Sequence, residues 1–347
     1  MPRIRFTLPE VKQRPDAPPS TCPRCGGVTF HKHGQVEKAI KGLYISRVTV
    51  VRYRCVACGR TLRRYPEGVD RHIQSKRLRA LSALSWALGL SHRSVSNLLT
   101  ALGSALSRMS SWRDVQEAGV GAMRALSGGL RARVEVVGAD EAVVKLKGEK
   151  AVVGFVMDAE RGRLLGIDLL VERDRAGFTE WLSGYVDKFG VKAIVSDDLN
   201  TYKPVVEELG LEHQICLAHV RKNVRRRLNE IEGWDWHKAR IWLLLSELPE
   251  GGGAELMSME RNVREDAELR RLVVELSDKW RSLRRHKSAR GLPETNNCTE
   301  RMIGRSKIRY KTVRGYKSIE GMMNGLRLRQ WVWSGEDGLC VGELVNA

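Results

Sequence analysis

Long apolar runs are missing from the 347-residue sequence, and no segment approaches the length of a membrane-spanning helix. The sequence also lacks the pattern of a signal peptide or a lipid anchor. These absences disfavour a membrane partner, and we expect an intracellular soluble protein. A chain of this length exceeds the usual size of one hydrophobic core, so we expect two or three domains.

Acidic residues are scarce in the amino-terminal third. Residues 1–130 contain 22 Lys and Arg against 7 Asp and Glu, whereas the rest of the chain is near neutral. Most of the net charge of +19 is therefore concentrated in one part of the sequence. Because a protein that only needs solubility would spread its charge, this asymmetry indicates a polyanionic partner, and nucleic acid is the obvious candidate.

The cysteines do not suit a disulfide framework, because their count of seven is odd and no secretion signal is present. Four of them form two CxxC pairs, 29 residues apart and each followed by glycine: Cys22, Cys25, Cys55 and Cys58. Two such knuckles can aim four thiolates at one structural zinc ion. The segments between them alternate apolar and polar residues, so residues 1–70 are predicted to form a zinc ribbon. Two disulfides or an iron site are the alternatives.

Arginines surround the second CxxC pair and would give the ribbon a basic face suited to phosphate groups. The candidates for DNA contact on this face are Arg52, Arg54, Arg63 and Arg64.

Residues 71–130 change to helical periodicity, with a leucine stripe that starts after Ser75. Gly89 fits the end of this helix, and Ser91 fits the N-cap of a second one. This order predicts a helix-turn-helix whose second helix enters the major groove of DNA. The side chains that it would offer to bases and phosphates are His92, Arg93, Ser96 and Asn97. An ordinary helical hairpin gives the same pattern, but the basic charge and the neighbouring ribbon favour DNA binding.

A short helix over residues 110–119 and a glycine-rich link over 119–129 are predicted to end this region. The following segment, 131–225, has the predicted order β-β-β-α-β-α-β. This order describes a mixed sheet with helices against its faces, which is an α/β architecture.

Two aspartates stand within or directly after apolar strands of this segment, Asp140 in the first strand and Asp197 after the fourth. Carboxylates among buried β-branched residues are costly unless they are paired or bind a metal. Two carboxylates brought together with a third would suit Mg²⁺ or Mn²⁺, and two such ions can clamp a phosphoryl transfer. Taken alone, strand-end aspartates are better explained as turn formers.

These features together resemble the DDE transposases of bacterial insertion sequences, close to their Mutator-type branch. The resemblance is carried by GADE, IVSDD and TNNCTER, and it implies the catalytic residues Asp140, Asp197 and Glu300. It also implies a ribonuclease H-like, mixed five-stranded sheet with a helical insertion, preceded by the zinc ribbon and the helix-turn-helix. Asp198 and Glu141 are rivals of their neighbouring aspartates.

The resemblance extends to CLAHVRKN, where Cys216 and His219 match a CxxH signature. It implies that this pair lies near the catalytic core and leaves the role of the two side chains open. The helix-rich residues 226–293 match the helical insertion. Residues 294–347 are then expected to complete the catalytic core with the Glu300 helix and a carboxy-terminal tail. Cations that follow Glu300 would line the path of the DNA: Arg301, Arg305, Lys307 and Arg309.

A transposase of this kind would cleave DNA at the terminal inverted repeats of its element and join the freed 3′-hydroxyl to target DNA, using two Mg²⁺ or Mn²⁺ ions. The resemblance further implies a homodimer or larger assembly and a place at the nucleoid in a prokaryotic cytoplasm. A DNA-binding regulator that no longer cuts and a structure-selective nuclease on the same fold are the rival interpretations.

Overall fold

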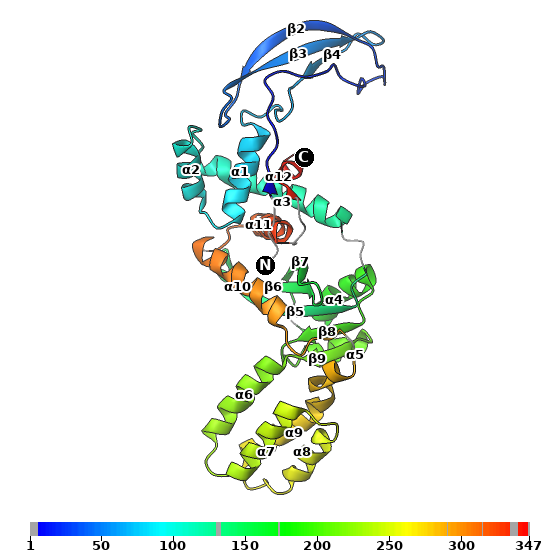
Figure 1. The fold of residues 1–347 in the computed structure, drawn as a ribbon, viewed down its shortest axis with the longest axis vertical. Helices are drawn as coiled ribbons and strands as arrows, with labels where there is room; N and C mark the ends of the chain where they lie inside the picture. Colours follow the sequence, from blue (N-terminus) through cyan, green and yellow to red (C-terminus); the bar gives the residue numbers. More distant parts are fainter. Residues whose placement is uncertain are drawn as a thin grey trace. The chain divides into compact units, whose positions relative to one another are not determined.

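The computed structural model describes residues 6–129, 133–172, 174–289, 291–313, 315–333 and 339–345. It divides into two compact units, drawn in Figure 1. Unit 1 consists of residues 1–129 and 311–347, and unit 2 consists of residues 130–310. No helix of the described residues is both long enough and apolar enough to cross a membrane.

Unit 1 begins with a three-stranded antiparallel sheet in the order β2-β3-β4. Its strands are β2 (Phe30–Ala39), β3 (Arg47–Cys55) and β4 (Thr61–Arg64). A small apolar cluster of Ile40, Val48, Val50 and Val69 covers one face, whereas β2 is almost wholly exposed. So small a core makes a further crosslink valuable for stability.

Two helices follow, α1 (Lys76–Ala87) and α2 (His92–Ala101), as the sequence predicts. The side chains of Ser75 and Ser91 cap them by accepting from backbone N–H groups of the first turn. The inner faces pack into one core through residues such as Leu78, Val95 and Leu99.

The third helix, α3 (Arg108–Gly129), is longer than predicted, because the glycine-rich stretch expected to be a link is helical. A Cβ atom at Gly119 would collide with the backbone and side chain of Asn324, and one at Gly121 would collide with Leu344. These glycines therefore permit close packing of α11 (Ile319–Val332) and α12 (Val341–Leu344) against α3.

The carboxy-terminal segment thus belongs to unit 1, which differs from the expected catalytic-core tail over 294–347. Only its first part, up to residue 310, lies in unit 2. A short parallel pairing of β1 (Phe6–Thr7) with β10 (Leu339–Cys340) adds to the closure of unit 1.

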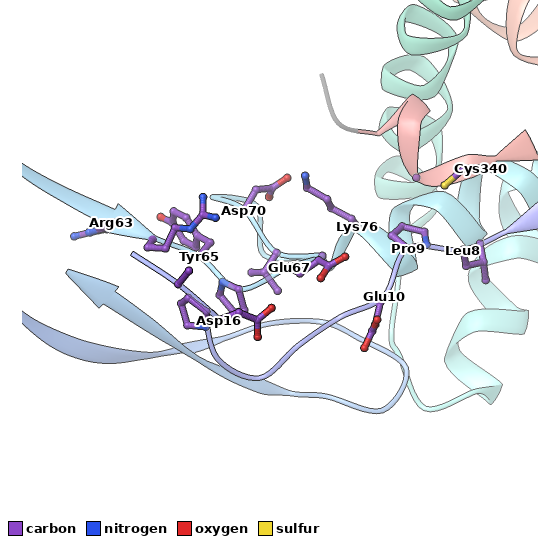
Figure 2. Close-up of a pocket in the computed structure, with 17 residues that line it drawn as sticks. Leu8, Pro9, Glu10, Asp16, Arg63, Tyr65, Glu67, Asp70, Lys76 and Cys340 are labelled. Atoms are coloured by element: carbon purple, nitrogen blue, oxygen red, sulfur yellow. The ribbon is translucent and has the colours of Figure 1, made fainter. Parts of the chain in front are cut away.

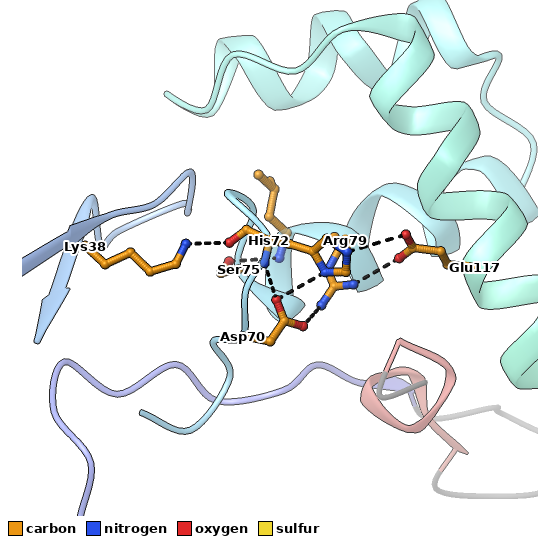
Figure 3. Close-up of polar contacts among 7 residues, drawn as sticks. Lys38, Asp70, His72, Ser75, Arg79 and Glu117 are labelled. Atoms are coloured by element: carbon orange, nitrogen blue, oxygen red, sulfur yellow. Dashed lines mark hydrogen bonds and ion pairs between the residues drawn. The ribbon is translucent and has the colours of Figure 1, made fainter. Parts of the chain in front are cut away.

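Polar contacts attach the segment between β4 and α1 to the three-stranded sheet and to the helices of unit 1. The buried guanidinium of Arg79 on α1 pairs with Asp70 and, at 2.9 Å, with Glu117 on α3 (Figure 3). Lys38 on β2 donates to the carbonyl oxygen of His72 at 2.8 Å. A cavity of about 790 Å³ lies nearby, with Glu10, Asp70 and Lys76 among its lining residues (Figure 2).

Unit 2 contains a five-stranded mixed sheet in the order β7-β6-β5-β8-β9. Its strands are β5 (Val136–Leu146), β6 (Glu149–Asp158), β7 (Arg163–Leu170), β8 (Ala193–Ser196) and β9 (Glu212–Ile215). The first three pair antiparallel, whereas β8 and β9 run parallel to β5. The predicted α/β architecture, a mixed five-stranded sheet with a helical insertion, is confirmed.

Two helices of unit 2 connect its strands, α4 (Arg175–Phe189) before β8 and α5 (Tyr202–Glu208) before β9. Their apolar side chains pack on the sheet around Phe178 and Tyr202, both fully buried. This core includes Val137, Ala139 and Ile194, which lie on β5 and β8 shortly before the predicted aspartates.

The helical insertion follows β9 as four helices and a single 3-10 turn. They are α6 (Leu217–Glu230), α7 (Asp235–Glu247), α8 (Gly252–Glu260), α9 (Ala267–Leu283) and η1 (Arg285–Lys287). They share a separate apolar core that includes Leu244, Leu272 and Trp280. The chain then returns to the sheet with α10 (Asn297–Val313), which carries Glu300.

Candidate functional site

Asp140 lies on β5, and Asp197 directly follows the end of the neighbouring parallel strand β8. The pairs Val136–Ala193 and Gly138–Val195 share one offset, and the same offset continued beyond the last pair would set Asp140 level with Asp197. Carboxylate oxygens of Asp140, Glu141 and Asp197 lie within 4.8 Å of one another. The sheet register therefore brings together the two aspartates predicted from the sequence, and Glu141 joins them.

Glu141, noted only as a rival of Asp140, has its own anchor. Its Oε1 atom accepts a hydrogen bond of 2.7 Å from the hydroxyl of the buried Tyr202 on α5. This bond directs the carboxylate toward Asp197, which stands a few residues before α5. The sequence signal for Glu141 was its position beside Asp140 in GADE.

The electrostatic environment of the cluster opposes ionisation. Burial, with the negative charges of Asp197 and Glu300, raises the pKa of Asp140 to about 6. Burial and the charges of Asp198 and Glu300 also raise the pKa of Asp197. Among the described residues no Lys or Arg forms an ion pair with either aspartate. Divalent cations are the natural counter-charge for such a set of oxygens.

Asp198 points to a different partner. Its carboxylate forms an ion pair of 2.8 Å with Lys279 on α9 of the helical insertion. Asp197 is therefore the member of the SDD sequence that lies in the acidic cluster, while Asp198 ties the end of β8 to the insertion.

Glu300 lies in the first turn of α10 and is close enough to raise the pKa of both aspartates. Its Oε1 atom is 3.5 Å from Nε2 of His219 and 3.8 Å from Sγ of Cys216. The CxxH pair thus contacts the predicted catalytic glutamate, a neighbour that spacing along the sequence could not reveal. Burial raises the pKa of the Cys216 thiol.

Asn296, which precedes α10, is held by four contacts. Its side-chain Nδ2 donates to the carbonyl oxygen of Ala139 at 2.8 Å, and its Oδ1 accepts from Oγ1 of Thr299 at 2.6 Å. Its backbone N–H donates to Sγ of Cys216 at 3.3 Å, and its carbonyl accepts from the N–H of Glu300 at 3.1 Å. The sequence patterns predicted no role for Asn296, because its partners Ala139 and Cys216 lie far away along the chain.

The cations that follow Glu300 are less uniform than the sequence suggests. Arg301 and Lys307 are exposed, and Arg305 is half-buried. The Nε group of Arg301 donates to the carbonyl oxygen of Asn297 at 3.2 Å. The side chain of Arg309 lies outside the described residues.

The four CxxC cysteines of unit 1 come together as predicted. Their Sγ atoms lie within 4.8 Å of one another, with Cys22 to Cys58 and Cys25 to Cys55 both at 3.7 Å. A tetrahedral ZnS₄ centre with Zn–S bonds of about 2.3 Å has S···S edges of about 3.8 Å. The donor set and its spacing therefore fit one zinc ion.

Both knuckles have the same backbone geometry, in which a glycine with φ of 71° follows the second cysteine. In the first, Gly26 donates to the carbonyl oxygen of Cys22, and in the second Gly59 donates to that of Cys55, each at 2.9 Å.

The ribbon arginines do not all share one face. Arg52 on β3 lies opposite Arg63 on β4, and Arg54 lies two positions further along on the same face. Arg64 pairs with Val51 and so points to the other face. Like charges directly opposite are destabilising in isolation, which indicates an anionic partner for the shared face.

The four residues predicted on the second helix also divide. Arg93 and Asn97 are exposed on one face of α2. His92 instead stacks on Trp86 with ring centroids 5.7 Å apart, and Ser96 donates to the carbonyl oxygen of Leu106. Of the four, Arg93 and Asn97 are therefore the exposed ones.

No protein-family model and no curated protein sequence matches the chain. Solved structures with which it has similarity include the catalytic core domain of BIV integrase, at 10% identity and a TM-score of 0.21, covering 50% of this chain and 98% of that one. The Drosophila P element transposase strand transfer complex has 13% identity and a TM-score of 0.38, covering 76% and 92%. The Mos1 transposase catalytic domain, solved with Raltegravir and Mn, has 12% identity and a TM-score of 0.20, covering 48% and 91%.

Proposed function

We propose that the chain is a DDE-class DNA transposase, of the Mutator-type branch, encoded by a prokaryotic insertion sequence. The observation that carries the proposal is the proximity of the Asp140 and Asp197 carboxylates where the pairing of β5 with β8 ends, with Glu300 on a helix anchored to β5. Two aspartates that pair with no Lys or Arg of the described residues, next to a third carboxylate, suit divalent ions that act on phosphate groups.

Asp140 and Asp197 of the acidic cluster, together with Glu300 beside Cys216 and His219, would hold two Mg²⁺ or Mn²⁺ ions. Bound ions would supply activation of the attacking oxygen and neutralisation of charge on the phosphate. The hydroxyl of Tyr202 keeps the Glu141 carboxylate in place beside this site, and Asp198 with Lys279 fixes the end of β8. Positioning and charge neutralisation suffice for phosphoryl transfer, so no covalent enzyme intermediate is required.

DNA recognition is assigned to unit 1 and to the start of α10. The zinc ribbon would present Arg52, Arg54 and Arg63 to phosphates, with one Zn²⁺ as a structural ion. The second helix of the helix-turn-helix would read the terminal inverted repeats through Arg93 and Asn97. Pairing of two element ends would require at least a homodimer, working at the nucleoid in the cytoplasm.

The direct test uses purified protein, Mg²⁺ and a DNA fragment that carries the inverted repeats flanking the gene. We expect cleavage at the repeat end followed by joining of the 3′-hydroxyl to a target plasmid, both detected on sequencing gels. Repeat binding without nicking would overturn the proposal in favour of a DNA-binding regulator. Nicking without joining would favour a structure-selective nuclease.

A further inference from the structure

Asn296 is a polar residue with only 2% of its surface exposed, at the position where the chain returns from the insertion to the sheet. Burial of an amide is unfavourable unless its donors and acceptors are bonded. Each contact of Asn296 leads to an element that carries a residue of the candidate active site. The inference drawn from it rests on the proposed function of that site.

The side chain of Asn296 attaches to β5 directly beside Asp140. The recorded pairing of β5 with β8 ends at Gly138 and Val195, and the next carbonyl oxygen of β5, that of Ala139, accepts from the Asn296 amide at 2.8 Å. The amide therefore binds the backbone immediately before Asp140, where the parallel ladder stops. A shift of Asn296 would be transmitted to the start of α10 relative to this aspartate.

The same side chain attaches to its own helix. Its Oδ1 atom accepts from Oγ1 of the fully buried Thr299, one residue before Glu300. An ordinary N-cap side chain accepts from a backbone N–H of the first turn. Here the recorded side-chain bond is to Thr299, while the carbonyl oxygen of Asn296 accepts from the backbone N–H of Glu300 at 3.1 Å.

Gly138 provides the space for this contact. A Cβ atom at this position would collide with Oγ1 of Thr299 and with Oδ1 of Asn296. The start of α10 therefore lies directly on the backbone of β5, closer than any side chain at this position would permit.

The backbone N–H of Asn296 donates to Sγ of Cys216, which lies at the start of α6. The backbone N–H of Cys216 in turn donates to the carbonyl oxygen of Ser196, next to Asp197, at 2.8 Å. One chain of bonds thus runs from the strand of Asp197 through Cys216 to Asn296, and from there to Asp140 and Glu300.

We propose that Asn296 is a positioning residue that sets the separation of Glu300 from Asp140 and Asp197, so that the three carboxylates can hold the same divalent ions. Cys216 acts as its partner in this role, which connects the CxxH and TNNCTER motifs through one buried contact. Groups that orient metal ligands typically change metal affinity by about 10- to 100-fold when they are removed.

The test compares Asn296→Ala with Asn297→Ala, which removes the neighbouring exposed asparagine. Mn²⁺ affinity is measured by electron paramagnetic resonance without DNA, together with the Mn²⁺ concentration for half-maximal DNA cleavage. We expect Asn296→Ala to weaken Mn²⁺ binding by about 10-fold or more and to raise that concentration by the same factor, with unchanged DNA affinity. Asn297→Ala should stay within about twofold of the wild type.

Two variants of Thr299 distinguish a positioning role of its hydroxyl from a packing role of its side chain and from a failure to fold. Thr299→Ser keeps the hydroxyl and should bind Mn²⁺ like the wild type, whereas Thr299→Val keeps the volume and should weaken binding. Equal Mn²⁺ affinities of these two variants, or a lower melting temperature of Asn296→Ala with unchanged Mn²⁺ affinity, would overturn the proposal. Because Mn²⁺ binding needs no DNA, a wild-type protein that binds Mn²⁺ but cleaves no DNA would overturn the proposed function alone.

Discussion

Buried charge is treated differently in the two units. In unit 1 the guanidinium of Arg79, only 3% exposed, is compensated by Asp70 and Glu117. In unit 2 the aspartates Asp140 and Asp197 lie beside further carboxylates, and in the described part of the chain no Lys or Arg pairs with them. The charge of Arg79 is neutralised within the chain, whereas the charges of the two aspartates require a cation from outside the chain.

The difference separates structure from function. A buried ion pair that is complete within the protein serves to join elements, here the segment before α1, α1 itself and α3. A half-buried cluster of like charges with raised pKa values is costly for the fold and indicates a site for a ligand of opposite charge.

The largest effect is expected on DNA cleavage, for substitutions of the two aspartates in unit 2. Asp140→Asn or Asp197→Asn should reduce cleavage by at least about 10³-fold, because several kcal/mol of metal-mediated stabilisation are lost. Asp198→Asn should cost far less, because Asp198 pairs with Lys279 outside the cluster. Gel assays of cleavage and of DNA binding with all three variants provide the measurement. Full activity of Asp197→Asn would transfer the role to Asp198.

Removal of the compensated charge should instead harm the fold. Arg79→Met is expected to lower the free energy of unfolding of unit 1 by about 3 kcal/mol, because Asp70 and Glu117 lose their shared partner. The control Arg226→Met breaks an exposed pair with Glu230 and should cost less than about 0.5 kcal/mol. The loss of unfolding free energy is measured by hydrogen exchange, on the α1 amides for Arg79→Met and on the α6 amides for Arg226→Met. Equal losses in the two variants would contradict the comparison.

Asp114 in unit 1 belongs to neither group. It is a buried acid that accepts a hydrogen bond of 3.1 Å from a neutral partner, the side-chain amide of Gln74. Burial raises its pKa to about 7. The folded state therefore keeps a proton that the unfolded state releases near pH 4, and the stability of unit 1 falls as the pH rises from about 4 to about 7.

Asp114→Asn should remove this dependence. Above pH 7 we expect the variant to be more stable than the wild type by about 2–4 kcal/mol, with no difference below about pH 4. Urea denaturation across this pH range provides the measurement. Equal pH profiles of the two proteins would show that Asp114 is ionised without cost.

The smallest effect is expected on the ribbon. Arg63→Ala should weaken DNA binding by about 1 kcal/mol and reduce the salt dependence by about one counterion, as expected for a phosphate contact. Arg47→Ala, on the same sheet but paired with Glu37 at 3.3 Å, is the matched control and should have little effect. Fluorescence anisotropy at several salt concentrations distinguishes the two.

Much of unit 2 follows from local patterns. The alternating and apolar strand runs, with turns between them, predicted all five strands in their chain order, and the acids at Asp140 and Asp197 marked the strand positions that the register brings together. Local sequence can do this because burial of strands and placement of polar residues at strand ends are short-range effects.

Long-range packing explains what could not be predicted. Glycine lowers helix propensity, so residues 119–129 resembled a link, yet contact with α11 and α12 favours a helix there. The contacts of Glu300 with Cys216 and His219 join positions more than 80 residues apart. The same is true of Asn296 and Ala139.

The return of residues 311–345 to unit 1 has a consequence for the order of folding during synthesis. When α3 leaves the ribosome, α11 and α12, which cover its glycines, have not yet been made. The intervening 181 residues of unit 2, positions 130–310, are translated first. At about 5–20 residues per second, unit 1 waits on the order of ten seconds or more with an incomplete core. During this interval unit 2, whose contacts are made within one continuous segment, is free to fold first.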